Sequence, residues 1–89
     1  LEYHVIEYSV QDLKSNNLND FLIQHEYSKV IIKNIGIFYN HYKLLHNEFG
    51  PSIIFNNSNN IGYHLDGKSI KEIAFNRYKK LKKINESTM

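Results

Sequence analysis

The dipeptide Asp66-Gly67 restricts the fold of this chain more than any other feature of its sequence. A two-residue hairpin turn needs positive φ at both central positions, and Asp-Gly accepts this conformation readily. The preceding residues, Ile61 to Leu65, read IGYHL and have the composition of a β-strand. The sequence therefore predicts a β-hairpin here.

A helical pattern begins where this hairpin ends. Ser69 and Glu72 have the S-x-x-E spacing of a capping box. Apolar residues then recur at helical spacing, which predicts an amphipathic C-terminal helix over residues 69–84. We expect a stripe of Ile73, Tyr78 and Leu81 to pack this helix on the sheet. Segregation of hairpins from helix predicts the α+β class.

The rest of the chain predicts about four to six antiparallel strands, joined by short turns. Strand patterns lie at residues 3–8, 27–33, 36–39, 42–45, 52–55 and 61–65. Turns are expected at Asn34, at Asn40-His41 and from Glu48 to Pro51, where Gly50 can take a positive φ. The polar run at 56–60 predicts a loop.

An N-terminal helical segment is expected between the first two strands. Ser9 and Asp12 resemble a capping pair, and apolar spacing is helical over about residues 10–25. Asn16-Asn17 interrupts the pattern, so two short helices are possible.

A chain of 89 residues has the size of one small domain. We divide it into a strand-helix-strand lead-in (1–35), a hairpin region (36–68) and the C-terminal helix (69–84). It has no cysteine, which excludes disulfides, thiolate zinc sites and cysteine nucleophiles. No apolar run approaches the roughly 20 residues of a membrane span, and no secretory signal opens the chain. We therefore expect a cytoplasmic location.

Two stretches resemble a known repeat. Residues 43–55 read KLLHNEFGPSIIF, similar to K-L-H-R-E-D-G-P-A followed by an apolar strand. Residues 61–68 read IGYHLDGK, similar to the terminal cap of such arrays, in which a short charged helix follows. The match keeps His46, Glu48, Gly50 and Pro51, whereas Asn47, Phe49 and Ser52 depart from it.

These repeats, akin to MORN hairpins, recur in hypothetical proteins of tailed phages, giant DNA viruses and some low-GC bacteria. The resemblance covers about residues 36–84 and implies stacked antiparallel hairpins that serve binding or assembly. It implies no general activity. A weak internal match aligns Phe38 with Tyr63 and Lys43 with Lys68.

Several polar residues fall at the predicted turns. We assign turn-forming roles to His46, Glu48, Gly50, Pro51, Asp66 and Gly67. An imidazole and a carboxylate two residues apart could serve acid-base chemistry or bind a metal, but no third ligand is implied nearby. The five histidines lack metal-ligand spacing, so we expect neither metal nor cofactor. His64 alternates with its strand neighbours and is expected to face solvent.

Two sets of residues are candidates for contact with a partner. The aromatic candidates for protein binding are Tyr39, Tyr42 and Tyr63, which could equally stack on bases or pack across strands. The basic candidates for nucleic-acid contact are Arg77, Lys79, Lys80, Lys82 and Lys83. A solvated helix end is the alternative interpretation of this basic cluster.

The favoured hypothesis is a non-catalytic protein-binding module. No phosphate-binding glycine loop and no esterase elbow occurs in the sequence, so we do not expect an enzyme. Together with the resemblance, this suggests a phage or viral accessory protein that binds and modulates or inhibits a host protein complex. The alternatives are a nucleic-acid-binding protein that uses the basic helix and a structural, self-associating virion component. We expect no membrane partner, and the oligomeric state stays open.

Overall fold

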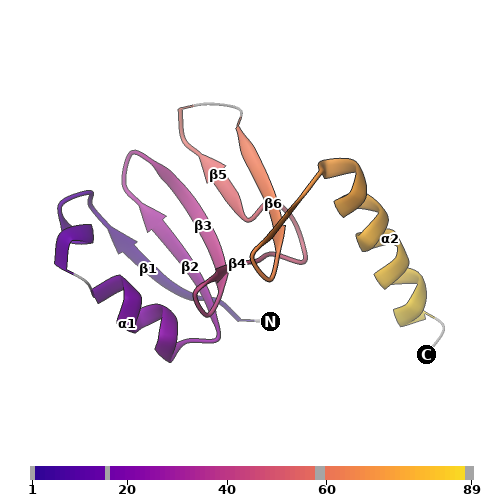
Figure 1. Cartoon of the computed structure of the whole chain (residues 1–89), viewed down its shortest axis with the longest axis horizontal. Helices are drawn as coiled ribbons and strands as arrows, with labels where there is room; N and C mark the ends of the chain where they lie inside the picture. The colour runs from indigo at the N-terminus through magenta and orange to yellow at the C-terminus, as the bar shows by residue number, and fades with distance from the viewer. Residues whose placement is uncertain (1, 16, 58–59, 88–89) are drawn as a thin grey trace.

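The computed structural model describes residues 2–15, 17–57 and 60–87. These residues form an open, seven-stranded sheet in the order β1-β2-β3-β5-β6-β7, with β4 beside β3 (Figure 1). The elements are β1 (His4–Tyr8), a 3-10 helix (Asp12–Ser15), α1 (Asn17–Gln24), β2 (Tyr27–Ile32), β3 (Gly36–His41), β4 (Leu44–Leu45), β5 (Ile53–Phe55), β6 (Ile61–Leu65), β7 (Lys68–Ile70) and α2 (Glu72–Ser87). The predicted α+β class, with a mostly antiparallel sheet and a C-terminal helix, is confirmed.

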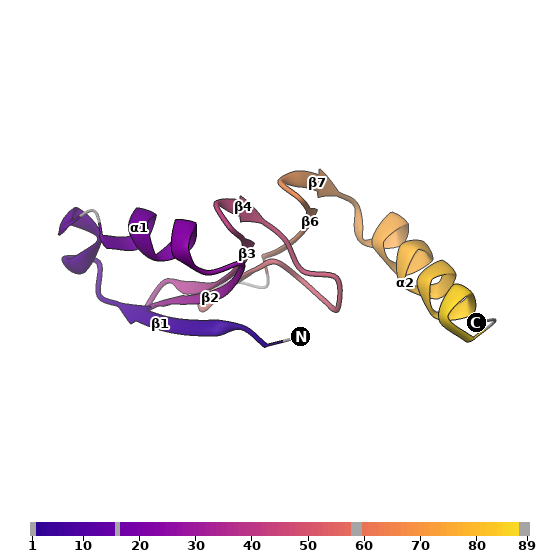
Figure 2. The same ribbon diagram turned by 90° about the horizontal axis from the view of Figure 1, so that it is seen from below.

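The first strand departs from the expected antiparallel sheet. β1 pairs with β2 in parallel, and every other pair is antiparallel. Parallel neighbours need a crossover connection, which the 3-10 helix and α1 supply. Ser9 and Asp12 start this crossover as a reciprocal cap. The Ser9 amide donates to Asp12 Oδ2 (2.9 Å) and the Asp12 amide donates to Ser9 Oγ (3.3 Å). α1 then lies on one face of β1, β2 and β3 (Figure 2).

The turn expected at Asn40-His41 is misplaced. Both residues continue β3, because β2 is long enough to pair with them: Tyr27 lies opposite His41. The chain reverses instead at Tyr42 and Lys43, and His41 pairs with Leu44 across the turn. The predicted strand at 42–45 therefore shrinks to β4.

The positions of the two hairpin turns also differ by one residue from the internal match seen in the sequence. Tyr42-Lys43 occupies the place in its hairpin that Asp66-Gly67 occupies in the second hairpin. The structure thus aligns Tyr42 with Asp66, whereas the match in the sequence sets His41 against Asp66.

The Asp66-Gly67 turn is confirmed. Asp66 has φ 47° and Gly67 has φ 83°, so both central residues are left-handed. The Gly67 amide donates to the Leu45 carbonyl (2.8 Å), which ties this turn to β4. A Cβ at Gly67 would lie 3.1 Å from Leu44 Cδ2, so the turn sits directly on that side chain.

The bend from Glu48 to Pro51 also forms, but Gly50 has no positive φ there. Asn47 closes the bend with its buried side chain. Its Oδ1 accepts from the Phe49 amide (2.9 Å) and its Nδ2 donates to the Pro51 carbonyl (2.9 Å). The side-chain amide thus makes an unusual glycine conformation unnecessary. Of the polar loop predicted at 56–60, residues 58 and 59 lie outside the described residues, as does Asn16.

We predict that Gly67→Val lowers the free energy of unfolding by about 1 kcal/mol or more, because a β-branched residue is strained at positive φ. Gly50→Ala is the matched control. Its Cβ would meet open space, with Asn47 Nδ2 4.0 Å away, and its φ is ordinary. Thermal unfolding of both variants measures the difference, and equal stabilities would contradict the assigned turn.

The C-terminal helix begins later than predicted. Ser69 pairs with His64 in the β6-β7 ladder, so it cannot cap a helix, and the expected capping box is not formed. α2 starts at Glu72, whose Oε1 accepts a hydrogen bond from the Tyr63 hydroxyl (3.4 Å). Ser69 stays in the sheet and does not cap the helix, because the Asp66-Gly67 turn leads directly into β7, which runs through Ile70.

The predicted packing stripe is wrong at two of its three positions. Ile73 is 67% exposed and Leu81 is 62% exposed, whereas Phe75 is 1% exposed and packs on the Tyr63 ring (centroids 4.7 Å apart). Tyr78, the third residue of the stripe, is half-buried and donates a hydrogen bond to Glu48.

One acidic residue explains this orientation of α2. Glu48 accepts hydrogen bonds from Tyr78 Oη (3.2 Å) and from Lys82 Nζ (2.8 Å). The helix projects past the end of the sheet, so these contacts and Phe75 set its rotation (Figures 1 and 2). The ion pair with Lys82 also lowers the pKa of Glu48.

We predict that Phe75→Ala lowers the free energy of unfolding by about 3 kcal/mol or more, since it empties a buried aromatic site. Leu81→Ala, at an exposed position of the same helix, should change it by less than about 0.5 kcal/mol. Chemical denaturation measures the loss of unfolding free energy in both variants. If the predicted stripe packed on the sheet, Leu81→Ala would be the more destabilising of the two.

Candidate functional site

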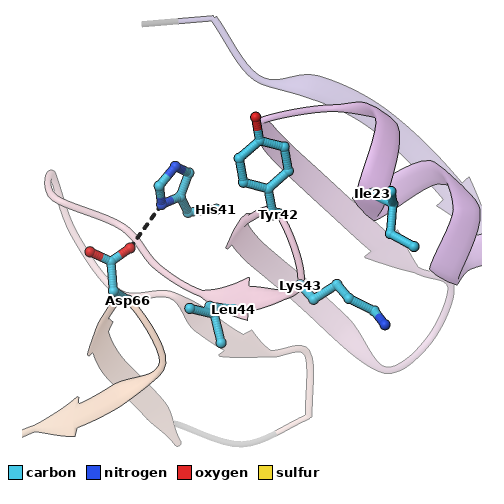
Figure 3. A pocket seen from close by; sticks show the side chains of 6 residues that line it. All are labelled: Ile23, His41, Tyr42, Lys43, Leu44 and Asp66. Carbon is cyan, nitrogen blue, oxygen red and sulfur yellow. Dashed lines mark hydrogen bonds and ion pairs between the residues drawn. The ribbon is translucent and has the colours of Figure 1, made fainter.

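A hollow of about 590 Å³ lies where the two hairpin turns meet the end of α1. We call it the turn-end site. Figure 3 shows its lining, which consists of Ile23, His41, Tyr42, Lys43, Leu44 and Asp66. Ile23 comes from α1, the next four from the β3-β4 hairpin and Asp66 from the β6-β7 turn. Segments distant in sequence thus build one surface.

The rim of the site is apolar and exposed. Ile23, Tyr42 and Leu44 are each about half exposed. The Tyr42 amide donates to the Glu26 carbonyl (2.7 Å), which fixes the backbone there, and the Leu44 side chain lies under Gly67. The site therefore offers apolar side chains on a preformed backbone.

The floor of the site is an imidazole held between two carboxylates. His41 Nδ1 lies 2.8 Å from Asp66 Oδ1, and His41 Nε2 lies 3.2 Å from Glu26 Oε2. The Tyr27 ring stacks on the imidazole, with centroids 4.8 Å apart. The hydrogen bond that His41 donates to the Asp66 carboxylate raises the pKa of His41; partial desolvation opposes this shift, and Glu26 adds to it. The same bond lowers the pKa of Asp66.

His46 extends this polar network beneath the turn. Its Nδ1 accepts a hydrogen bond from the Asp66 amide (2.8 Å), and its side chain is buried. His46 therefore does form a turn, as expected, but the turn is Asp66-Gly67 and not the bend from Glu48 to Pro51. Glu48 lies 3.9 Å from His46 Nε2 but makes its closer contacts with α2.

A serine-histidine pair lies between β5 and β6. His64 Nδ1 is 2.5 Å from Ser52 Oγ, and His64 is half-buried instead of facing solvent as expected. A nucleophile and a base need similar proximity, but Ser52 is 0% exposed and its hydroxyl also contacts the Gly62 carbonyl (3.0 Å). No substrate reaches that hydroxyl in this arrangement, so the pair cross-links the strands.

The three tyrosines predicted to bind a partner do not come together. Tyr42 lies in the turn-end site. Tyr39 is half-buried against Tyr3, with centroids 5.2 Å apart, and Tyr63 packs on Phe75.

The predicted basic residues all lie on α2. Arg77, Lys79, Lys80 and Lys83 are exposed, whereas Lys82 is half-buried in its ion pair with Glu48. Within the described ranges, no group of three or more potential ligands could hold a metal ion.

Sequence reasoning missed most of the turn-end site. The pattern assigns His41 to a turn, and Ile23 and Leu44 resemble ordinary core residues. The internal match between the two hairpin stretches could have revealed that two equivalent turns exist. It could not have shown that they lie side by side.

Comparison with protein-family models, with curated proteins and with solved structures finds no match to this chain. The MORN-like resemblance therefore stays a prediction. In the described part of the chain, no helix has the length and apolar character to cross a membrane.

We predict that His41 makes stability depend on pH. Because its pKa is raised in the folded state, its protonation stabilises the fold fully below the unfolded value of about 6.5. That contribution is lost as pH rises through the folded pKa. His41→Gln should flatten the decline of unfolding free energy between a pH of about 6.5 and the raised folded pKa, measured by denaturant titration.

Asp66→Asn provides a second variant, since asparagine tolerates positive φ but carries no charge. It should reduce the same slope by weakening the protonated form of His41. Parallel pH profiles for wild type and both variants would exclude this role.

Proposed function

We propose that this chain is a non-catalytic protein-binding module whose partner docks at the turn-end site. One observation carries the proposal: Tyr42 has φ 51° and its side chain is exposed, at 47%. A left-handed backbone costs a residue such as tyrosine roughly 1–2 kcal/mol, and Gly or Asn would avoid that cost. Strained residues cluster at functional sites, so an exposed aromatic ring at this position supports a binding role.

The surroundings of Tyr42 suit protein recognition. Interfaces derive most of their energy from aromatic anchors on well-packed surfaces, and Ile23 and Leu44 supply apolar contact area beside the ring. The His41 ring, 5.3 Å from that of Tyr42, is fixed below by its two carboxylates. A preformed site of this kind costs little entropy on binding.

The polar groups favour binding over chemistry. Both ring nitrogens of His41 contact carboxylates, so neither is open to take a proton from a substrate. The MORN-like resemblance extends the proposal to an accessory role: a phage or viral protein that acts in the host cytoplasm and modulates or inhibits a host protein complex.

The exposed cations of α2 favour a second candidate, a nucleic-acid-binding protein. Arg77, Lys80 and Lys83 could contact phosphates. Exposed Ile73 and Leu81 lie on the same helix, and a phosphate backbone offers aliphatic side chains nothing to pack against. We therefore rank protein binding first.

We predict that Tyr42→Asn leaves the fold unchanged, or more stable by up to about 1 kcal/mol, and weakens partner binding by about tenfold or more. The partner is first captured on the immobilised chain from a nuclease-treated lysate of source cells and then purified for titration. Circular dichroism measures stability, and calorimetric titration measures affinity.

Replacing Lys79, Lys80 and Lys83 with glutamine is the control, and it should leave affinity nearly unchanged. Lys82 is spared because it anchors α2 through Glu48. Unaltered binding by Tyr42→Asn would refute the assignment of the site. Capture that occurs only from an untreated lysate, and that the lysine set abolishes with a steep salt dependence, would favour nucleic acid instead.

A further inference from the structure

α1 covers one face of the sheet, and the opposite face has no such cover. Val30, Phe38 and Asn40 line a small hollow together with Leu18 and Leu22 of α1, so these strand positions face the helix. Side chains alternate along a strand, so their neighbours point to the other side. Figure 2 shows α1 on one side of β1, β2 and β3 and no described helix across the opposite side.

We call this second side the open face. Ladder register places Val5 beside Lys29, Lys29 beside Tyr39, and Ile31 beside Ile37. Its members are Val5, Glu7, Lys29, Ile31, Ile37, Tyr39 and Ile54. Val5 is 59% exposed, and the isoleucines are incompletely buried.

The strands have the composition of a sheet that is covered on both sides. An antiparallel sheet with one wet face alternates apolar and polar residues, whereas doubly covered strands are apolar throughout. The end of β2 reads Val-Ile-Ile and β5 reads Ile-Ile-Phe, so both faces are apolar at the centre of this sheet. A hydrophobic sheet face is stable when it packs on another layer.

The dimensions of the chain agree with a missing layer. A compact monomer of 10.6 kDa exposes about 5,500 Å² by size scaling. This chain exposes 6471 Å², about 1,000 Å² more, an excess to which the projecting α2 and the open face both contribute; a standard interface buries about 800 Å² per partner. Its radius of gyration is 14.3 Å, against about 12 Å for a compact domain of this length.

We propose that a second copy of this chain covers the open face, giving a two-fold symmetric dimer in which the two sheets pack face to face. The charges of the face support this occupant. Glu7 and Lys29 are one acid and one base, so the face is neutral and self-complementary. A two-fold axis would bring Glu7 of each copy toward Lys29 of the other, as an isologous interface requires.

The residues around these charges fit the same arrangement. Lys29 Nζ lies 5.7 Å from the centre of the Tyr39 ring, which keeps the ammonium group on the face. Among the described residues, neither Glu7 nor Lys29 has an ion pair within the chain. Aligned sheets pack about 10 Å apart, a distance that Ile31 and Ile37 from both copies can fill.

The test compares charge reversals by sedimentation velocity over a wide range of protein concentration. Wild type should reach twice the 10.6 kDa mass of the chain. Glu7→Lys and Lys29→Glu should each raise the dimer dissociation constant about tenfold or more, because like charges then face each other. An equimolar mixture of the two variants should recover the dimer, since opposite charges again meet.

Two further variants keep the test decisive. Lys33→Glu makes the same charge change as Lys29→Glu at an exposed position in the β2-β3 turn, and it should dimerise like wild type. Val5→Lys, on the exposed edge strand, should dissociate the dimer even if a charge reversal proves unstable by circular dichroism.

A wild type that stays monomeric at every concentration would overturn the proposal. So would a dimer whose dissociation constant does not change in the open-face variants. Tyr42 lies in the turn between β3 and β4 and is not a member of the open face, so Tyr42→Asn should remain dimeric. This proposal and the proposed function can therefore fail independently.

Discussion

The structure depends on the junction between its two tight hairpins, where Asp66 makes contacts in two directions. Its amide donates to His46, and its carboxylate holds His41, which in turn contacts Glu26. Gly67 adds a backbone hydrogen bond to β4. These bonds join segments that are distant in sequence into one corner. They fix the β6-β7 turn to the β3-β4 hairpin, and they add to the pairing of β6 with β5 and to the contacts of Glu48 with α2.

This corner matters because the chain has little core elsewhere. Of the described apolar side chains, only Tyr8, Val30 and Phe75 are buried. A single sheet with a helix on one face cannot bury both of its apolar sides. Hydrogen bonds and ion pairs therefore take over positioning that packing provides in larger domains. The same lack of a second layer leaves the turn-end site and the open face available to partners.

Expectations from the sequence succeeded where the information is local. Asp66-Gly67 takes its positive φ values because the residues of the turn itself decide them. Ser9 and Asp12 cap each other because both lie within one turn of the chain. Expectations failed where a distant partner decided. The β3 turn moved to Tyr42 because β2 pairs through His41, and α2 rotated because Glu48 holds its far end.

The sequence by itself determined the α+β class, the hairpin at Asp66-Gly67 and a helix at the C-terminal end, because turn chemistry and hydrophobic period act over a few residues. Tertiary structure alone decided which apolar residues are buried. Ile73 and Phe75 are both apolar members of α2, and no pattern within the helix says which of them meets the sheet. It also placed Tyr42, His41 and Asp66 in one site, since long-range pairing, not local preference, brings two turns that are far apart in sequence into contact.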